Sequence, residues 1–266
     1  MPINQPTDDT LAGLPTREEL QAELLAVPDL PPQPEPPVSP GFDDILSEAL
    51  RYVRDRRGAD LLAVILVGSG ARRSLTAHSD VNLIALVKGQ DEGEEIIRVA
   101  DRFIDIRYRS HKAVEQEMPH ALRLASILRK GRVLMEHESA GGKVVEKAAQ
   151  RFRQGPPPAG MNEKIHLKAE CLHRLGKADD MQAQPPTAHY LLNLFVDDLL
   201  LAFFRLNGYW CTAPADMLRF VMTRDPGVGE LLERLLSAPA LEERLTVARQ
   251  ATVLVFKDVP SPARVD

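Results

Sequence analysis

The amino-acid sequence predicts an α/β (α+β) domain with a short mixed sheet, followed by an all-α helical bundle domain. The first observation is a set of short apolar runs, typical of buried strands, in the first part of the chain. These runs cover residues 61–67, 81–87 and 102–109, and a further strand is expected over 132–137. The second observation is that the chain after residue 160 shows apolar residues at helical spacing and no convincing strand pattern.

Helical segments are expected before, between and after these strands along the chain. Residues 42–57 carry apolar side chains at helical spacing, and Gly58 follows where a glycine commonly ends a helix. Between the second and third strands, residues 89–100 ("GQDEGEEIIRVA") are polar and capable of forming a helix. The stretch "GGKVVEKAAQRFR", residues 141–153, is predicted to close the α/β domain as a helix.

A domain boundary is predicted at "QGPPPAG", residues 154–160, because three consecutive prolines cannot continue a helix or a strand. The α/β domain is therefore expected over 42–153 and the helical bundle over 161–258. The bundle helices are expected near residues 162–180, 187–206, 213–224, 226–237 and 240–257.

The first 41 residues are expected to form an acidic, proline-rich tail. Residues 1–40 carry seven acids and one arginine, a net charge of −6, so the rest of the chain carries +1. Seven prolines within residues 28–40 favour a semi-rigid extended spacer, and residues 16–27 before it show the pattern of one short capped helix. A nearly neutral body argues against an extended nucleic-acid surface and leaves local basic clusters for a small anionic ligand.

The apolar runs, the first residues and the cysteines indicate in which cellular compartment the protein is expected. The longest continuous apolar runs fall well short of the roughly 20 residues that cross a bilayer, and the first ten residues lack the basic start of a signal peptide. The two cysteines, Cys171 and Cys211, have no metal-ligand spacing and fit reduced core thiols. We therefore expect a cytoplasmic protein with no membrane partner, and a homodimer is one possible assembly.

Polar residues open one apolar strand and interrupt another. Asp80 and Asn82 lie one residue apart and so project to the same face of their strand, while Asp105 sits between Ile104 and Ile106. If the two strands are neighbours, the three side chains converge into an oxygen-rich cluster suited to Mg²⁺. Gly68 and Ser69 end the preceding strand where backbone N–H groups can meet a phosphate.

This pattern resembles the DNA polymerase beta-like nucleotidyltransferase superfamily. The matching elements are "LVGS" at 66–69, ten intervening residues, Asp80-Val81-Asn82, and "IDI" around Asp105. The resemblance covers about residues 42–153. The helical remainder looks like the bundle that follows this domain in antibiotic-modifying and similar small-substrate nucleotidyltransferases.

The resemblance implies transfer of a nucleoside monophosphate from a nucleoside triphosphate, with ATP the expected donor, to a hydroxyl of a small molecule or a protein. Asp80 and Asp105 would be the catalytic residues and, with Asn82, the ligands of Mg²⁺, possibly two ions. Gly68, Ser69 and Arg72 would bind the nucleotide. Arg107 and Arg109 are further candidates to neutralise phosphate charge or to pair with the local carboxylates.

Two departures from the family pattern leave alternatives open. The family usually has an acid where Asn82 stands, and usually Arg-Gly where this chain has Arg72-Arg73. An amide in place of a carboxylate removes negative charge beside the metal, although an amide oxygen still coordinates Mg²⁺. The alternatives are a catalytically weakened nucleotide-binding sensor or regulatory protein, and a protein interaction module that uses the bundle and the tail.

Other polar residues have plainer interpretations beside the functional ones. His78 fits a solvated turn better than a phosphate contact. A helical stripe of acids and histidines resembles a metal site but more commonly forms a solvated face; its members are Glu163, His166, Glu170 and His173. Asn193 and Asp197 lie one turn apart on an apolar helix, where they either line a cleft or are satisfied by buried partners.

Overall fold

The computed structural model describes residues 41–262, except residues 77 and 90. The predicted tail, apart from Gly41, and the short helix expected over 16–27 lie outside these residues. The helices and strands follow the chain in the order α2 (Phe42–Arg57), the 3₁₀ turn η1 (Gly58–Asp60), β1 (Leu61–Val67), α3 (Gly68–Ala71), β2 (Val81–Val87), β3 (Gly93–Val99), β4 (Arg102–Ser110), α4 (His111–Glu117), α5 (Leu124–Leu128), β5 (Arg132–Glu136), α6 (Ala140–Gln154), α7 (Met161–Asp180), α8 (Pro185–Leu206), α9 (Pro214–Arg224), α10 (Pro226–Ser237) and α11 (Leu241–Val255).

The five strands form one sheet in the order β3-β4-β2-β1-β5. Strand β1 pairs antiparallel with both β2 and β5, whereas β2 pairs parallel with β4, and β3 closes the edge antiparallel to β4. The predicted mixed sheet is therefore confirmed, with its four predicted strands at or within a residue of their expected bounds.

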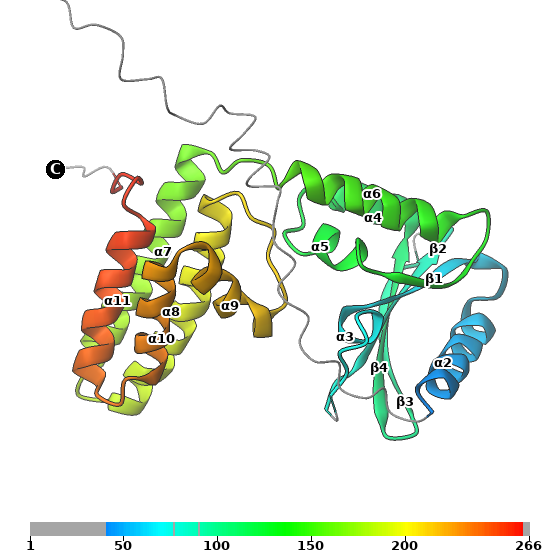
Figure 1. The fold of residues 1–266 in the computed structure, drawn as a ribbon, viewed down its shortest axis with the longest axis horizontal. Coiled ribbons are helices and arrows are strands. Elements are labelled where there is room, and N and C mark those ends of the chain that lie inside the picture. Colours follow the sequence, from blue (N-terminus) through cyan, green and yellow to red (C-terminus); the bar gives the residue numbers. More distant parts are fainter. Residues whose placement is uncertain (1–40, 77, 90, 263–266) are drawn as a thin grey trace, which may run out of the picture. The chain divides into compact units, whose positions relative to one another are not determined.

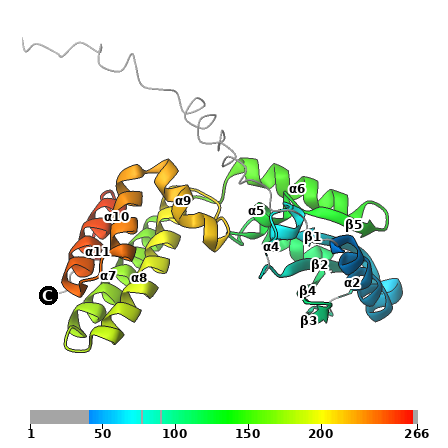
Figure 2. The ribbon, with the colours of Figure 1, turned by 60° about the horizontal axis from the view of Figure 1, so that its bottom comes forward.

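Helices pack on both faces of this sheet (Figures 1 and 2). Helix α2 covers one face, where its Leu46 and Val53 join a core with Leu83 and Ile106. Helices α4, α5 and α6 cover the other face over β1 and β2, whose buried apolar residues there belong to a second cluster. Strand β1 is apolar throughout and β2 is apolar apart from Asn82, as expected of strands buried on both sides.

The interpretation of residues 89–100 as capable of forming a helix is wrong for Gly93–Val99, which form the edge strand β3. Pairing with β4 supplies the backbone hydrogen bonds that a helix would otherwise make locally. Exposure alternates along β3, with Ile97 and Val99 partly buried toward the core and Ile96 facing solvent. The short helices α4 and α5 were not expected from the sequence either.

The five helices predicted after residue 160 are all present, each within about two residues of its expected bounds. Prolines occupy the first turns of α8, α9 and α10, where the missing N–H costs no helical hydrogen bond. Helix α7 packs against α8, and α10 packs against α11. By their contacts, the described residues belong to one compact unit.

Helix α8 is long and apolar enough, by length and composition alone, to cross a membrane. Half of that apolar window is buried in the structure, and fully buried residues such as Phe195 and Leu199 anchor the helix among its neighbours. A core helix of a soluble protein has the same properties, so α8 is weak support for a membrane span.

Candidate functional site

The start of β2 presents two polar side chains on one face. Val81 and Leu83 are almost fully buried in the core beneath α2, whereas Asn82 is partly buried and Asp80, just before the strand, is exposed. Successive side chains of a strand point to opposite faces, so Asp80 and Asn82 share the face away from α2. The alternation read from the sequence is thus present in the fold.

Strand β4 places Asp105 beside Asn82. The two strands pair in parallel, and Asn82 and Asp105 are direct partners in the register. Their neighbours Ile104 and Ile106 are fully buried on the opposite face. Directly paired residues project to the same side of a sheet, so the amide and the carboxylate are adjacent. The expectation that these two strands are neighbours is confirmed.

The turn after β1 reaches the same place. Val67 is the register partner of Asn82, and Gly68 follows with a positive φ of 70°. A Cβ built on Gly68 would lie 3.7 Å from Asn82 Nδ2, so the bare backbone of the turn lies against this amide. Ser69 is partly buried in the one-turn helix α3. The turn, Asn82 and Asp105 therefore form one row across the sheet.

The loop before Asp80 is held by a residue that the sequence analysis did not select. Arg102 Nη1 donates to Thr76 O at 2.7 Å and to Ser79 O at 3.0 Å. Within the loop, Thr76 N donates to Ser79 Oγ at 2.8 Å. Arg102 thereby fixes the backbone immediately preceding Asp80. Nothing in the spacing of Arg102 signals this role, because it depends on the pairing of β2 with β4.

Arg72, the predicted nucleotide-binding arginine, has a carboxylate partner. Its Nη1 lies 3.2 Å from Asp216 Oδ2 at the start of α9, and Arg219 Nη2 contacts the other oxygen of Asp216 at 2.8 Å. The next residue, Arg73, has a φ of 55°, in the left-handed region that favours glycine. The turn therefore keeps at Arg73 a backbone conformation suited to glycine, the residue usual there in the family that the sequence resembles.

The two arginines that follow Asp105 on β4 also pair with carboxylates. Arg107 Nη2 lies 3.3 Å from Asp105 Oδ2, within the row itself. Arg109 Nη2 lies 2.6 Å from Glu117 Oε2 on α4. Burial acts to lower the pKa of Arg109, but the hydrogen bond and charge of Glu117 outweigh it and raise the pKa above the ordinary value. Arg109 thus has a structural partner, and Arg107 belongs to the candidate site.

The half of this sheet face formed by β3 and β4 carries exposed apolar side chains. Ile96 of β3 is the register partner of Asp105, and Phe103 lies two residues before Asp105 on the same side of β4. Ile96 is 72% exposed and Phe103 is 61% exposed. The row therefore continues from Gly68 through Asn82 and Asp105 to an open apolar surface.

The remaining candidates lie away from this row. His78 is exposed in the loop. In the helical stripe of acids and histidines, for which a solvated face is the preferred interpretation, His166 pairs with Glu170 at 3.1 Å and Glu163 pairs with Arg205. Among residues 41–262 without 77 and 90, no three His, Cys, Asp or Glu side chains gather as a metal site. The stripe is an exposed face with one pair inside it, His166 with Glu170, whereas Glu163 pairs with Arg205 of α8.

Asn193 has a buried partner, as one of its two interpretations requires. Its Oδ1 accepts a hydrogen bond from Arg244 Nη2 at 2.7 Å, and Arg244 itself is only 6% exposed. Asp197, one turn later on α8, is exposed. Both residues are therefore exposed, and Asn193 in addition binds the buried Arg244.

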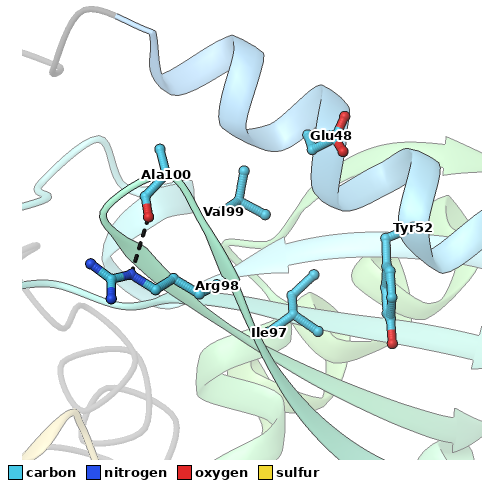
Figure 3. A pocket seen from close by; sticks show the side chains of 6 residues that line it. All are labelled: Glu48, Tyr52, Ile97, Arg98, Val99 and Ala100. Atoms are coloured by element: carbon cyan, nitrogen blue, oxygen red, sulfur yellow. Dashed lines mark hydrogen bonds between the residues drawn. The ribbon is translucent and has the colours of Figure 1, made fainter.

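Two cavities lie elsewhere in the molecule. One hollow of about 350 Å³ lies between α2 and β3 on the opposite face of the sheet, lined by Glu48, Tyr52, Ile97, Arg98, Val99 and Ala100 (Figure 3). The other, of about 460 Å³, is lined by residues that include His120, Glu163 and Arg205. Neither is lined by Asp80, Asn82 or Asp105, so chemistry and register, rather than cavity size, define the candidate site.

No protein-family model and no curated protein matches this sequence. Among solved structures, the chain is similar to the crystal structure of a nucleotidyltransferase-like protein from Exiguobacterium sibiricum 255-15. The two share 15% sequence identity with a TM-score of 0.49, over 80% of this chain and 75% of the other. With so few residues in common, a function for this chain has to be proposed from its own side chains.

Proposed function

We propose that the protein is a nucleotidyltransferase that moves a nucleoside monophosphate from a nucleoside triphosphate to a hydroxyl group. ATP is the proposed donor, and the acceptor is a small molecule or a protein side chain. The observation that carries the proposal is the direct pairing of Asn82 with Asp105, with the Gly68 turn lying against the same amide. The backbone of the Gly68 turn lies beside side chains with oxygen ligands, which supports a site for a metal and a phosphate such as nucleotidyl transfer requires.

The donor set fits Mg²⁺. Two carboxylates, Asp80 and Asp105, and the amide oxygen of Asn82 are all hard oxygen ligands, the type that Mg²⁺ binds together with phosphate and water. The absence of a side chain at Gly68 leaves the backbone open to a phosphate beside them. When bound, Mg²⁺ neutralises charge on the attacking and leaving oxygens of the transferred phosphoryl group.

The protein residues then have separate roles in the proposed reaction. Asp105, next to the open half of the face, orients the acceptor hydroxyl and accepts its proton as the oxygen attacks. The hydroxyl oxygen forms a bond to the α-phosphorus, the bond to the β-phosphate oxygen breaks, and pyrophosphate leaves. The backbone N–H groups of Gly68 and Ser69 hold the triphosphate, and Arg72 reaches it by exchanging its Asp216 partner for phosphate.

The acceptor side of the proposed reaction is the open surface beside Asp105. Ile96 lies on β3, on the side of β4 away from the Gly68 turn, so it is placed to contact an acceptor rather than the phosphates, and Phe103 lies two residues before Asp105 on β4 itself. A cytoplasmic location, a homodimer and the absence of membrane or extended nucleic-acid partners remain part of this proposal.

Calorimetric titration of ATP with Mg²⁺ into the full chain tests the proposal. Asn82→Asp should tighten binding by roughly tenfold, because it adds a negative charge beside the cation in a partly screened site. Asp80→Ala and Asp105→Ala should each abolish binding without altering the circular dichroism spectrum. Asp101→Ala is the matched control, since Asp101 is a fully exposed carboxylate in the β3–β4 turn. If neither the wild type nor Asn82→Asp binds, the proposal is wrong and the interaction module remains.

One observation favours a second candidate function, a nucleotide-binding sensor or regulatory protein. Asp80, Asn82 and Asp105 together offer two carboxylates and one amide, so they supply less negative charge than a site with three acids. Nucleotide binding without pyrophosphate release, across the four nucleoside triphosphates and a library of hydroxyl acceptors, would identify the sensor. Pyrophosphate release would identify the enzyme.

A further inference from the structure

Arg107 lies between two carboxylates on the open half of the sheet face. Its Nη2 is 3.3 Å from Asp105 Oδ2, and its Nε is 3.6 Å from Glu94 Oε1. Glu94 is the register partner of Arg107 on β3. The Asp105 side chain is 20% exposed, whereas those of Arg107 and Glu94 are 51% and 71% exposed. Arg107 therefore bridges a largely buried carboxylate, Asp105, and an exposed one, Glu94.

The guanidinium of Arg107 takes a position that matters for the proposed metal site. It supplies positive charge to Asp105 Oδ2, one of the two oxygens that a divalent cation would use. A cation and a guanidinium on one carboxylate repel each other, since like charges a few ångströms apart disfavour joint occupancy. Glu94 offers Arg107 a second carboxylate already in reach on the solvent side.

We propose that Arg107 is a positioning residue that competes with the divalent cation for Asp105. When the cation binds, Arg107 leaves Asp105 and pairs with Glu94 alone. Without the cation, Arg107 neutralises Asp105 and holds its side chain in place. With the cation, the guanidinium moves entirely onto Glu94. This inference rests on the proposed function, because it concerns the same carboxylate.

The proposal predicts opposite changes in cation affinity for substitutions of Arg107 and Glu94. Arg107→Gln removes the competitor, so the affinity of Asp105 for a cation should rise. Glu94→Gln removes the alternative partner of Arg107, so the affinity should fall. If Glu94 acts only through Arg107, Glu94→Gln should have no further effect in the Arg107→Gln background.

Mn²⁺ titration of the full chain, followed by the electron paramagnetic resonance signal of the free ion, measures this affinity without catalysis. Arg107→Gln should tighten Mn²⁺ binding by roughly two- to fivefold, the range of exposed ion pairs. Glu94→Gln should weaken it by a similar factor, and the double variant should match Arg107→Gln. Arg98→Gln is the control, because Arg98 is an exposed arginine on β3 that pairs with Asp101. Its affinity should stay within twofold of the wild type.

The possible results separate this proposal from the proposed function. If Arg107→Gln leaves the Mn²⁺ affinity unchanged while Asp105→Ala weakens it, Arg107 does not compete with the cation. The proposed metal site would still be supported. If Glu94→Gln still changes the affinity in the Arg107→Gln background, the proposed exchange of partners by Arg107 is wrong. The charge of Glu94 would then act on the cation directly. Wild-type binding that Asp105→Ala does not weaken, or no binding by any variant, would overturn both. Thermal unfolding curves confirm that each variant is folded.

Discussion

The conformation of single residues decides the shape of the candidate phosphate turn. Gly68 and Arg73 both adopt positive φ values, 70° and 55°, at the two ends of the same turn. The left-handed region costs a residue with a side chain about 1–2 kcal/mol, and glycine nearly nothing. The turn therefore depends on glycine at its first end, where the backbone also approaches Asn82, and carries strain at Arg73.

Gly68→Ala should lower the free energy of unfolding by about 1 kcal/mol, because the left-handed cost exceeds the entropy gained in the unfolded chain. Gly176 is the matched control, an exposed glycine inside α7 with no atom near the position of an added Cβ. Gly176→Ala should raise the free energy of unfolding by about 0.5–1 kcal/mol. Urea unfolding of both variants measures the difference, and a stabilised Gly68→Ala would contradict the strain argument.

At the scale of elements, one buried arginine joins several helices of the C-terminal part. Arg244 of α11 donates from Nε to Leu235 O at 2.8 Å and from Nη2 to Asn193 Oδ1, and its Nη1 lies 2.8 Å from His189 Nδ1. Burial lowers the pKa of Arg244. These bonds tie α11 to α8 and to the end of α10, so Arg244 fixes how the three helices pack.

Arg244→Ala should destabilise the protein by about 2–4 kcal/mol, because it leaves the carbonyl of the buried Leu235 without its donor, removes the contacts with His189 and Asn193, and creates a cavity. Arg249→Ala is the control from the same helix. Arg249 is about half exposed and pairs with Asp179 at the surface, so its loss should cost less than about 1 kcal/mol. Equal losses of stability for the two variants in urea unfolding would show that Arg244 has no special structural role.

At the scale of the whole molecule, burial of ionisable groups couples folding to pH. Burial raises the pKa of Cys171 to about 12, with smaller contributions from the charges of Asp198 and Glu170. Burial also raises the pKa of Cys211 above its ordinary value. Both thiols keep their protons in the folded state at pH values where the unfolded chain loses them.

Above a pH of about 8.5 the unfolded state therefore binds fewer protons than the native state, and the free energy of unfolding should fall as pH rises. The expected slope is up to about 1.4 kcal/mol per pH unit for each thiol, until the folded pKa is reached. Urea unfolding at pH 8 and pH 10 measures it. Cys171→Ala should show a shallower decline than the wild type, and an identical decline would exclude Cys171 as the cause.

Several features of this protein follow from the sequence by itself. The strands over β1, β2, β4 and β5 and the helices after residue 160 are local patterns of apolar spacing, proline and glycine. Such patterns specify elements directly, because an element that buries one face needs apolar residues at its own repeat, about 3.6 residues in a helix and two in a strand, whatever it packs against. The shared face of Asp80 and Asn82 has the same origin, since side chains alternate along any strand.

The tertiary structure alone decided the rest. Residues 93–99 become strand β3 because β4 offers a hydrogen-bonding edge, which a polar segment of 12 residues does not reveal on its own. The partners of Arg72 and Arg102 are equally invisible in the sequence, because each pairs with a group on a distant segment, whereas for Arg107 the sequence indicates local carboxylates without choosing among them. Sequence determines which side chains share a face, whereas long-range pairing determines which charges meet there.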